Sequence, residues 1–382
     1  KETEIRNVLL KILLINYEYP PFGGGAANAT QQIALALVDA GHQVAVLTGA
    51  VGNAVNRHDG VDLIPVNSKR RRYGQSNLLE MGSFLIRACW WVLRLKQREW
   101  DVAIVFFGVP CGPIASLLKW RHGIPYIVSL RGGDVPGFEP QMTGLHTLLT
   151  PIRRLIYRSA LDVVANSRSL ASLSESHDPG PVRVIPNGVD TAFFRPENHS
   201  RGTGDDLRLL MSSRFHRQKR IPETLFLLNQ ARQAGISFKL LLVGEGPDEG
   251  RIKETISSLS MEPHVTLMGW VKKKELVSIY QSVDCFLSLS LHEGMPNSVL
   301  EAMACELPVM LSDIPSHRAL VKDKITGFLV NPEDASAVVE SLNLIEMNPV
   351  QATEMGKKAR ELAEQEFSWS ATASGYLSLF NT

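Results

Sequence analysis

Short runs of Val, Ile and Leu alternate with segments of helical periodicity along almost the whole of this 382-residue chain, and this alternation limits its fold more than any other feature. Near-continuous apolar strands between helices are typical of parallel sheets that helices cover on both faces. The expected strands are residues 8–15, 44–48, 102–106, 126–129, 162–165, 183–185, 207–211, 238–243, 265–268, 284–288 and 308–311. The expected helices include residues 26–40, 145–158, 222–234 and 297–305. The pattern therefore predicts a doubly wound α/β fold.

The alternation runs twice, once on each side of a glycine-rich, polar stretch that begins at Asn187. A chain of this length is too long for one ordinary core and suits two domains. We therefore predict one Rossmann-like domain over residues 1–190 and a second over residues 191–366. Ligands of doubly wound folds bind at the carboxyl ends of the strands, so we expect a ligand site in a cleft between two such edges.

Composition and charge narrow the possible functions. Hydrophobic residues make up 44% of the chain and charged residues 21%, which is typical of a globular protein. Residues 1–190 hold 20 Lys and Arg against 15 Asp and Glu, a surplus of +5, whereas residues 191–382 hold 20 against 24, or −4. The basic first half can attract an anionic partner or a membrane surface, and no nucleic-acid partner is expected.

Two further patterns bear on location and on metal binding. The chain has no apolar run long enough to span a bilayer, and its first residues resemble a strand with a short leader rather than a signal peptide. The four cysteines are scattered without CxxC spacing or paired histidines, so neither a disulfide framework nor a zinc site is predicted. We expect a cytoplasmic protein in a reducing compartment.

The most informative stretch is LHEGMPNSVLEAMACELPVM, residues 291–310. A turn follows a buried strand here, and Asn297 or Ser298 can cap the helix that comes next. The amides at a helix N-terminus suit a diphosphate. Glu293 lies before the turn and Glu301 inside the helix, so both carboxylates can accept hydrogen bonds from sugar hydroxyls. The alternative is a capped helix with one solvated glutamate.

A second candidate is SSRFHRQKR, residues 212–220, directly after the first strand of the second half. Arg214 and Lys219 at this strand end could neutralise two phosphates as they become a leaving group. The alternative is a solvated basic loop.

Glycine-rich turns follow strands in both halves. Gly244 and Gly246 occupy a strand-to-helix turn in the second half, and the first half has three consecutive glycines after its first strand: Gly23, Gly24 and Gly25. Glycines let a backbone approach a ligand closely. The early loop is not the GxGxxG dinucleotide fingerprint, and no acidic residue follows at the ribose position, so a dehydrogenase is disfavoured.

Taken together, these motifs resemble the retaining GT-B glycosyltransferases of the family 4 type, which include sucrose and glycogen synthases and many bacterial polysaccharide enzymes. The resemblance covers nearly the whole chain. It rests on the early glycine loop, PNGVD at residues 186–190, the basic and glycine motifs above, and the Glu293 and Glu301 pair with seven residues between. It also implies a helix over residues 367–382 that crosses back to the first domain.

The resemblance implies roles for these residues. Glu293 would bind hydroxyls of the donor sugar, Glu301 those of the ribose, and Arg214 with Lys219 would stabilise the departing diphosphate without a metal or other cofactor. Five consecutive residues would bind sugar and phosphate through backbone amides: Gly294, Met295, Pro296, Asn297 and Ser298.

Two departures from the family pattern stand out. Many relatives have His-Gly-x-Asp where this chain has Arg131-Gly132-Gly133-Asp134. Arg131 cannot act as a base at neutral pH, so we expect it to bind phosphate or an anionic acceptor, with Asp134 near the acceptor; a structural Arg–Asp pair is the alternative. Glu306 follows Cys305 where relatives usually have Gly, for which we expect a local effect at a helix end.

The segment around Arg131 resembles bacterial transferases that build lipid-linked oligosaccharides and surface polysaccharides. Residues 69–98 form a helical pattern in which polar residues leave a wide apolar face with Trp90 and Trp91. Such a helix, flanked by bases, can lie in a membrane interface, which would make the protein peripheral on the inner face of the membrane. The alternative is a core helix of the first domain.

We therefore expect a retaining transferase that moves a hexose or N-acetylhexosamine from a nucleoside-diphosphate sugar, UDP-sugar favoured, to a hydroxyl of a glycan or polyprenyl-linked glycan. Two rivals are a nucleotide-sugar 2-epimerase of the same fold and a non-catalytic protein that binds sugar nucleotides. The epimerase needs catalytic acids and a histidine in the cleft, whereas the carboxylates and cations found here suit transfer.

Overall fold

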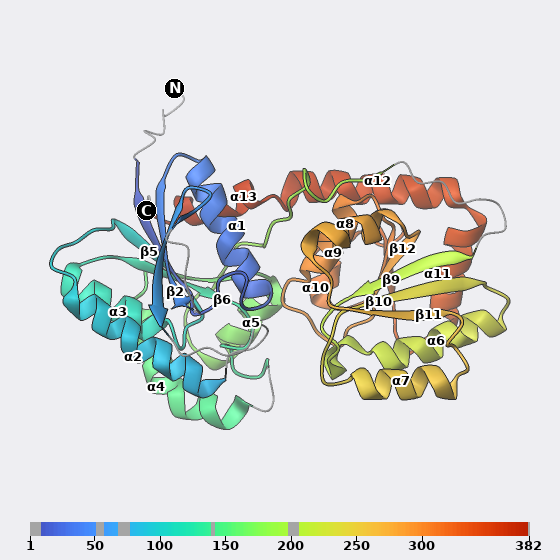
Figure 1. The fold of residues 1–382 in the computed structure, drawn as a ribbon, viewed down its shortest axis with the longest axis horizontal. Coiled ribbons are helices and arrows are strands. Elements are labelled where there is room, and N and C mark those ends of the chain that lie inside the picture. Colours follow the sequence, from blue (N-terminus) through green and yellow to red (C-terminus); the bar gives the residue numbers. More distant parts are fainter. Residues whose placement is uncertain (1–8, 51–56, 68–76, 139–141, 198–205, 381–382) are drawn as a thin grey trace. The chain divides into compact units, whose positions relative to one another are not determined.

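The computed structural model of the chain describes residues 9–50, 57–67, 77–138, 142–197 and 206–380. They divide into two compact units, one of residues 1–187 with 369–382 and one of residues 188–368 (Figure 1). Within these described residues, no helix combines the length and the apolar character that crossing a bilayer requires.

The first unit is built on one sheet with strand order β3-β4-β2-β1-β5-β6-β7-β8, parallel except for β3. Its strands are β1 (Lys11–Ile15), β2 (Gln43–Ala50), β3 (Arg57–His58), β4 (Val61–Asn67), β5 (Val102–Phe106), β6 (Tyr126–Leu130), β7 (Asp162–Ala165) and β8 (Arg183–Val184). Its helices are α1 (Gly25–Asp39), α2 (Leu78–Arg94), α3 (Gly112–His122), α4 (Thr143–Ser159), α5 (Arg168–His177) and α13 (Trp369–Ser378).

Alternate residues of the central strand β1 enter different cores, because successive side chains of a strand point to opposite faces of its sheet. Leu13 and Ile15 pack with residues of α2 to α5, whereas Ile12 and Leu14 pack with residues of α1 and α13. Since both faces of the sheet are buried, its strands are near-continuous apolar runs, as the sequence indicated.

The second unit has an all-parallel sheet with strand order β11-β10-β9-β12-β13-β14. Its strands are β9 (Leu207–Ser212), β10 (Phe238–Val243), β11 (Val265–Gly269), β12 (Cys285–Ser288), β13 (Val309–Ser312) and β14 (Phe328–Val330). Its helices are η2 (Arg217–Lys219, a 3₁₀ turn), α6 (Ile221–Gln233), α7 (Glu249–Ser258), α8 (Lys273–Gln281), α9 (Asn297–Ala304), α10 (Pro315–Arg318), α11 (Ala335–Met347) and α12 (Pro349–Glu366).

The prediction of two doubly wound parallel-sheet units is confirmed. The prediction missed three strands, β3, β4 and β14. β4 alternates buried and exposed residues around Pro65, so it lacks a continuous apolar run, and β14 has only three residues. The first strand begins at Lys11; the predicted start at Val8 lies outside the described residues.

The observed division of the chain assigns the last helix, α13, to the first unit, where Trp369, Ala373 and Tyr376 are buried beside α1. The Tyr376 hydroxyl lies 2.6 Å from that of Ser129 at the end of β6, and the Thr372 hydroxyl donates to the carbonyl of Pro186 at 2.9 Å. These contacts tie the end of the chain to the middle of its first sheet.

Candidate functional site

The strongest candidate site lies at the centre of the second sheet, where β9 and β12 pair as neighbours. The strand order reverses between these two strands, since β9 leads outward to β10 and β12 leads the other way to β13. In open α/β sheets, ligands bind at the carboxyl ends of the strands at such a reversal. The segment after β9 carries Arg214 and Lys219, and the segment after β12 carries Glu293.

Lys219 and Glu293 form an ion pair across this position. Only 7% of the Glu293 side chain and 19% of the Lys219 side chain are exposed. Gln218 fastens the same two segments together: its carbonyl accepts from the Leu291 amide at 2.9 Å, and its side-chain amide donates to the His292 carbonyl at 2.5 Å. Residues more than seventy positions apart are thus held in one rigid pair of loops.

The electrostatics of the pair keep Glu293 ionised. Burial raises the pKa of the Glu293 carboxyl, but the Lys219 ammonium and hydrogen bonds from Lys219 and Ser290 outweigh burial, and the pKa lies below its ordinary value. The site therefore presents a fixed carboxylate beside a fixed ammonium, a combination that can accept from hydroxyls and bind an anion at the same time.

His317 is connected, through Ser312 and Ser290, to the loop that carries Glu293. It is fully buried, and its Nδ1 lies 2.9 Å from the Ser312 carbonyl oxygen. The Ser312 hydroxyl in turn donates to the Ser290 carbonyl at 2.7 Å, so the chain of contacts reaches the loop that carries Glu293. Burial lowers the pKa of His317, which keeps the ring neutral. Sequence reasoning missed His317, because a lone histidine after a strand carries no motif.

Glu301 lies in α9 and is bound by Tyr280 of α8. The buried Tyr280 hydroxyl donates to Glu301 Oε2 at 3.0 Å. Burial raises the pKa of Glu301 to about 7, although the Tyr280 hydrogen bond and Lys273 lower it. The sequence placed Glu301 correctly in a helix but did not identify Tyr280, because an aromatic residue at helical spacing is usually part of a core.

Helix α9 begins at Asn297, within the predicted amide-binding run Gly294 to Ser298. The predicted amide contact through Pro296 is wrong, because proline has no amide hydrogen. The prediction that Asn297 or Ser298 caps the helix is wrong: the capping position is Pro296, and no side chain caps the first turn. Proline is tolerated there because it lacks only an amide that the helix cannot pair internally.

Arg214 is exposed between Ser213 and Phe215, and its side chain forms no salt bridge or hydrogen bond with the residues that the structure describes. The glycine turn shapes this segment. A Cβ on Gly244 would lie 1.9 Å from the Ser213 carbonyl oxygen, and one on Gly246 would lie 2.2 Å from that of Phe215. These glycines thus have a packing role: they allow the backbone of one loop to lie against the loop that carries Arg214.

In the first unit, the early glycine loop also lies at a reversal of strand order, since it follows β1, which pairs with both β2 and β5. Gly23 adopts φ +98°, and a Cβ there would lie 2.7 Å from Glu18 Oε2. Gly24 is the capping residue of α1 and has no side chain to offer, so no cap occupies the first turn of that helix.

Arg131 and Asp134 follow β6, but their side chains do not pair. The Arg131 guanidinium lies over the Phe106 ring at 4.7 Å and donates to Asn187 Oδ1 at 2.7 Å and to the Tyr376 hydroxyl at 3.4 Å. The Asp134 carboxylate accepts from three backbone amides, those of Gly108 at 2.9 Å, Arg131 at 3.0 Å and Gly132 at 3.1 Å.

These contacts give Asp134 a loop-holding role. Burial raises the pKa of its carboxyl, while the amides that it binds lower it, and the net direction is upward. The structural Arg131–Asp134 pair given as the alternative takes the form of a hydrogen bond from the Arg131 amide to the Asp134 carboxylate, and no side-chain hydrogen bond between the two is found among the described residues. The acceptor-binding roles of both residues stay predictions.

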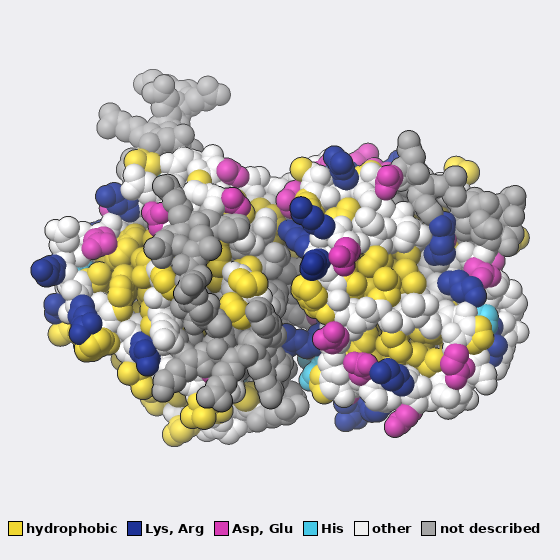
Figure 2. All heavy atoms as spheres, in the orientation of Figure 1, with side chains coloured by type: hydrophobic (Ala, Val, Ile, Leu, Met, Phe, Trp, Pro, Cys, Tyr) yellow, Lys and Arg dark blue, Asp and Glu magenta, His cyan; other side chains and the backbone are white. Residues whose placement is uncertain are grey.

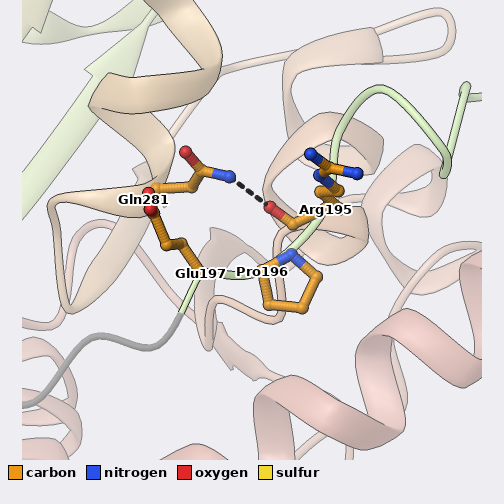
Figure 3. Close-up of a pocket in the computed structure, with 4 residues that line it drawn as sticks. All are labelled: Arg195, Pro196, Glu197 and Gln281. Carbon is orange, nitrogen blue, oxygen red and sulfur yellow. Dashed lines mark hydrogen bonds between the residues drawn. The ribbon is translucent and has the colours of Figure 1, made fainter.

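A surface hollow in the second unit lies apart from these residues in the sequence. It is lined by Arg195, Pro196, Glu197 and Gln281, and the Gln281 side-chain amide donates to the Arg195 carbonyl at 2.8 Å (Figure 3). None of the predicted donor-site residues lines it, and its walls hold no pair of groups suited to catalysis.

Comparison with known proteins identifies the family of the chain. Residues 24–188 match the family described as "Glycosyl transferase 4-like domain", and residues 194–362 match "Glycosyl transferases group 1". The chain is 24% identical to the glycogen synthase of Mycobacterium tuberculosis, over 96% of this chain and 94% of that protein.

Two further likenesses bear on fold and chemistry. The chain is 26% identical to the GDP-mannose:cellobiosyl-diphosphopolyprenol alpha-mannosyltransferase of Xanthomonas oryzae, over 69% of each chain. Its fold is similar to that of Anabaena HepE, solved in complex with UDP-glucose, with a TM-score of 0.75, 16% identity, and coverage of 97% of this chain and 99% of that one.

Proposed function

Because this chain belongs to the GT4-type glycosyltransferases and has their GT-B fold, we propose that it is a retaining hexosyl- or N-acetylhexosaminyltransferase that uses a nucleoside-diphosphate sugar. The observation that carries the proposal is the buried Lys219–Glu293 pair at the strand-order reversal of the second sheet, beside the first turn of α9. A carboxylate, an ammonium and helix amides at one edge match the hydroxyls and the diphosphate of such a donor.

Each group has a distinct part in the proposed reaction. Glu293 accepts hydrogen bonds from donor-sugar hydroxyls, and Glu301 accepts from the ribose. Lys219 and Arg214 stabilise the negative charge that develops on the diphosphate as the glycosidic bond breaks, which a metal ion would otherwise do. The acceptor hydroxyl attacks from the face that the diphosphate leaves, and a phosphate oxygen takes its proton, so the product keeps the configuration of the donor.

Donor and acceptor are proposed by class. We favour a UDP-sugar, supported by the HepE complex, and a glycan or polyprenyl-linked glycan in bacterial surface polysaccharide or lipid-linked oligosaccharide synthesis, supported by the name of the Xanthomonas relative. Such an acceptor would place the enzyme in the cytoplasm, at the inner face of the membrane.

The decisive experiment is a donor screen followed by two substitutions. UDP, GDP and ADP are compared by thermal shift, since a ligand that binds the folded chain stabilises it by RT ln(1 + [L]/Kd). The matching sugar nucleotides are then assayed for release of the nucleoside diphosphate. We expect Glu293→Ala and Lys219→Ala each to lower turnover about a hundredfold, which is typical of losing a positioned electrostatic group. The surface ion pair of Lys253 and Glu249 supplies matched controls.

The control variants and the two alternative functions predict different outcomes. Lys253→Ala and Glu249→Ala should turn over at the wild-type rate, because that pair lies on the exposed side of α7. Binding of a sugar nucleotide without release of its nucleoside diphosphate would favour a non-catalytic protein. Conversion of the donor sugar without an acceptor would favour the epimerase. An anomeric NMR coupling that shows the product to have the configuration opposite to that of the donor would exclude a retaining mechanism.

A further inference from the structure

The outer side of α2 is apolar, although its inner side already packs on the core of the first unit. Phe84, Ala88 and Val92 are buried there, and Trp91 packs against Trp100 with ring centroids 5.6 Å apart. A second stripe faces solvent at helical spacing: Leu79, Ile86, Trp90 and Leu93, with Leu79 85% exposed. The alternative of a core helix is confirmed for the inner side of α2, and the outer side exposes an apolar face whose membrane contact stays a prediction.

Two neighbouring helices continue the exposed apolar surface. On α4, Leu148, Ile152 and Leu155 recur at intervals of four and three residues on the solvent side, and Leu148 is 74% exposed. Trp120, near the end of α3, is 78% exposed. α3 packs against both α2 and α4, and all three helices contribute to one core, so they lie in one layer and their outer sides form one surface.

The charges on this surface are almost all positive. The exposed bases of the three helices are Arg87, Arg94, Lys119, Arg121, Arg154 and Arg158. Their one acidic residue, Glu80, is engaged in the capping box of α2, where it binds the Asn77 amide. Figure 2 shows hydrophobic side chains interleaved with Lys and Arg at the lower left, over the helices labelled α2, α3 and α4 in Figure 1.

Apart from Arg154, which pairs with Asp178, these bases have no acidic partner among the described residues. Aromatic and aliphatic side chains beside such bases match one occupant best. We propose that the outer faces of α2, α3 and α4 bind the interface of an anionic lipid bilayer. Apolar side chains enter the boundary between headgroups and acyl chains, and the bases bind lipid phosphates. The Arg94 guanidinium stacks 3.2 Å from the centroid of the Trp90 ring, so one residue pair offers both kinds of contact. A second copy of the chain fits less well, because it would bring the same bases face to face.

Binding to a bilayer would also give the enzyme access to a lipid-linked acceptor. This access rests on the proposed function, whereas membrane binding itself does not. The proposal replaces the single helix expected from the sequence with a surface of three helices. Arg70, Arg71 and Arg72, which are among the bases that flank this helix in the sequence, lie outside the described residues.

Cosedimentation of the full chain with vesicles tests the surface without any donor. Wild-type protein should pellet with vesicles of phosphatidylglycerol and phosphatidylcholine at low salt and be released as salt rises, because the Debye length falls from about 10 Å at 0.1 M to about 3 Å at 1 M. Trp120→Ser with Leu148→Ser should lower the partition coefficient at least tenfold. The matched control, Met347→Ser with Val350→Ser, removes two equally exposed side chains of the second unit and should change it less than twofold.

A charge variant completes the test. Arg121→Ser with Arg158→Ser should weaken binding to anionic vesicles and leave the weaker binding to pure phosphatidylcholine unchanged. Equal losses for the surface and control pairs, wild-type protein that stays in the supernatant, or a change of oligomeric state in the Trp120/Leu148 variant would each overturn the proposal. Release of the nucleoside diphosphate from a water-soluble sugar nucleotide should be unaffected in every variant. Failure of the membrane-binding proposal is therefore distinguishable from failure of the proposed function.

Discussion

Glu301→Gln should make the folded chain more stable at pH 8 while it weakens the binding of a nucleoside diphosphate. The Glu301 carboxyl is held between the Tyr280 hydroxyl and the body of α9, and burial raises its pKa to about 7 from an ordinary value of 4.5. An acid with a raised pKa is less stable when ionised, so at pH 8 the folded wild-type chain bears a cost that an unfolded chain does not. Glutamine removes that cost and keeps the size and the hydrogen bond.

The sign and the size follow from the two pKa values. Between pH 4.5 and about 7 the folded chain keeps a proton that the unfolded chain has lost, so this group's contribution to stability falls as pH rises through that window. At about 1.36 kcal/mol for each pH unit that separates the two values, the loss is at most on the order of 3 kcal/mol. The variant should therefore equal the wild type near pH 4.5 and exceed it at pH 8.

Urea unfolding of both proteins without ligand, at several pH values from 4.5 to 8, measures the difference in the free energy of unfolding. Glu293→Gln is the matched control with the opposite sign. The pKa of Glu293 is lowered, so its contribution is present above the unfolded value of 4.5 and is lost as pH falls through the folded pKa. That variant should be less stable than the wild type throughout pH 4.5 to 8, and the difference should shrink only as pH falls below 4.5.

A pH-independent difference between Glu301→Gln and the wild type would show that the pKa of Glu301 is the same in the folded and unfolded chains, and it would refute the reasoning. Binding supplies a second readout. The amide offers one acceptor oxygen where the carboxylate offers two, and we expect UDP affinity at pH 8 to fall about tenfold, as for a lost hydrogen bond to a charged group. Unchanged affinity would remove Glu301 from the ribose site.

Three other changes give sharp outcomes. Arg131→Lys keeps the charge but loses the fork that reaches Asn187 and Tyr376 together, so we expect acceptor transfer to fall more than donor hydrolysis in paired assays; equal losses would place Arg131 at the donor. Glu306→Gly should raise the free energy of unfolding by up to about 1 kcal/mol in urea, because Glu306 sits at φ +60°, where a Cβ is strained; a destabilised variant would contradict this. EDTA should leave activity largely intact, since Lys219 and Arg214 are proposed to act where a metal would; loss that magnesium restores would be contrary to it.

The sheets were predictable from the sequence wherever a strand is buried on both faces. β5, β7 and β10 have the predicted bounds, because β5 is continuously apolar and β7 and β10 each contain a single charged residue, Asp162 or Lys239, beside an apolar run. β4 was missed because Asp62 and Pro65 interrupt its pattern. The order of strands in each sheet was beyond the sequence, since it depends on which distant segments pair.

The candidate site shows the same division between local and distant information. Local motifs predicted that Glu293 and Lys219 belong to one site, and Glu306 confirms the expected effect at a helix end, because it adopts the left-handed conformation just after α9. The direct ion pair and the supports from Tyr280 and His317 could not be predicted, since each joins residues from different elements whose sequence spacing carries no common period.

The position of α13 has a consequence for how the protein folds during its synthesis on the ribosome. The first unit, begun at the N-terminus, lacks a wall of its core until Trp369, Ala373 and Tyr376 have been synthesised, whereas the second unit, residues 188–368, is continuous in sequence. The Val189 amide donates to the Phe367 carbonyl at 2.7 Å, so the chain enters and leaves the second unit at neighbouring residues, as in an inserted domain. The part of the chain made first is thus completed last, and any truncation of the final helix leaves the earlier half with its apolar core open to water.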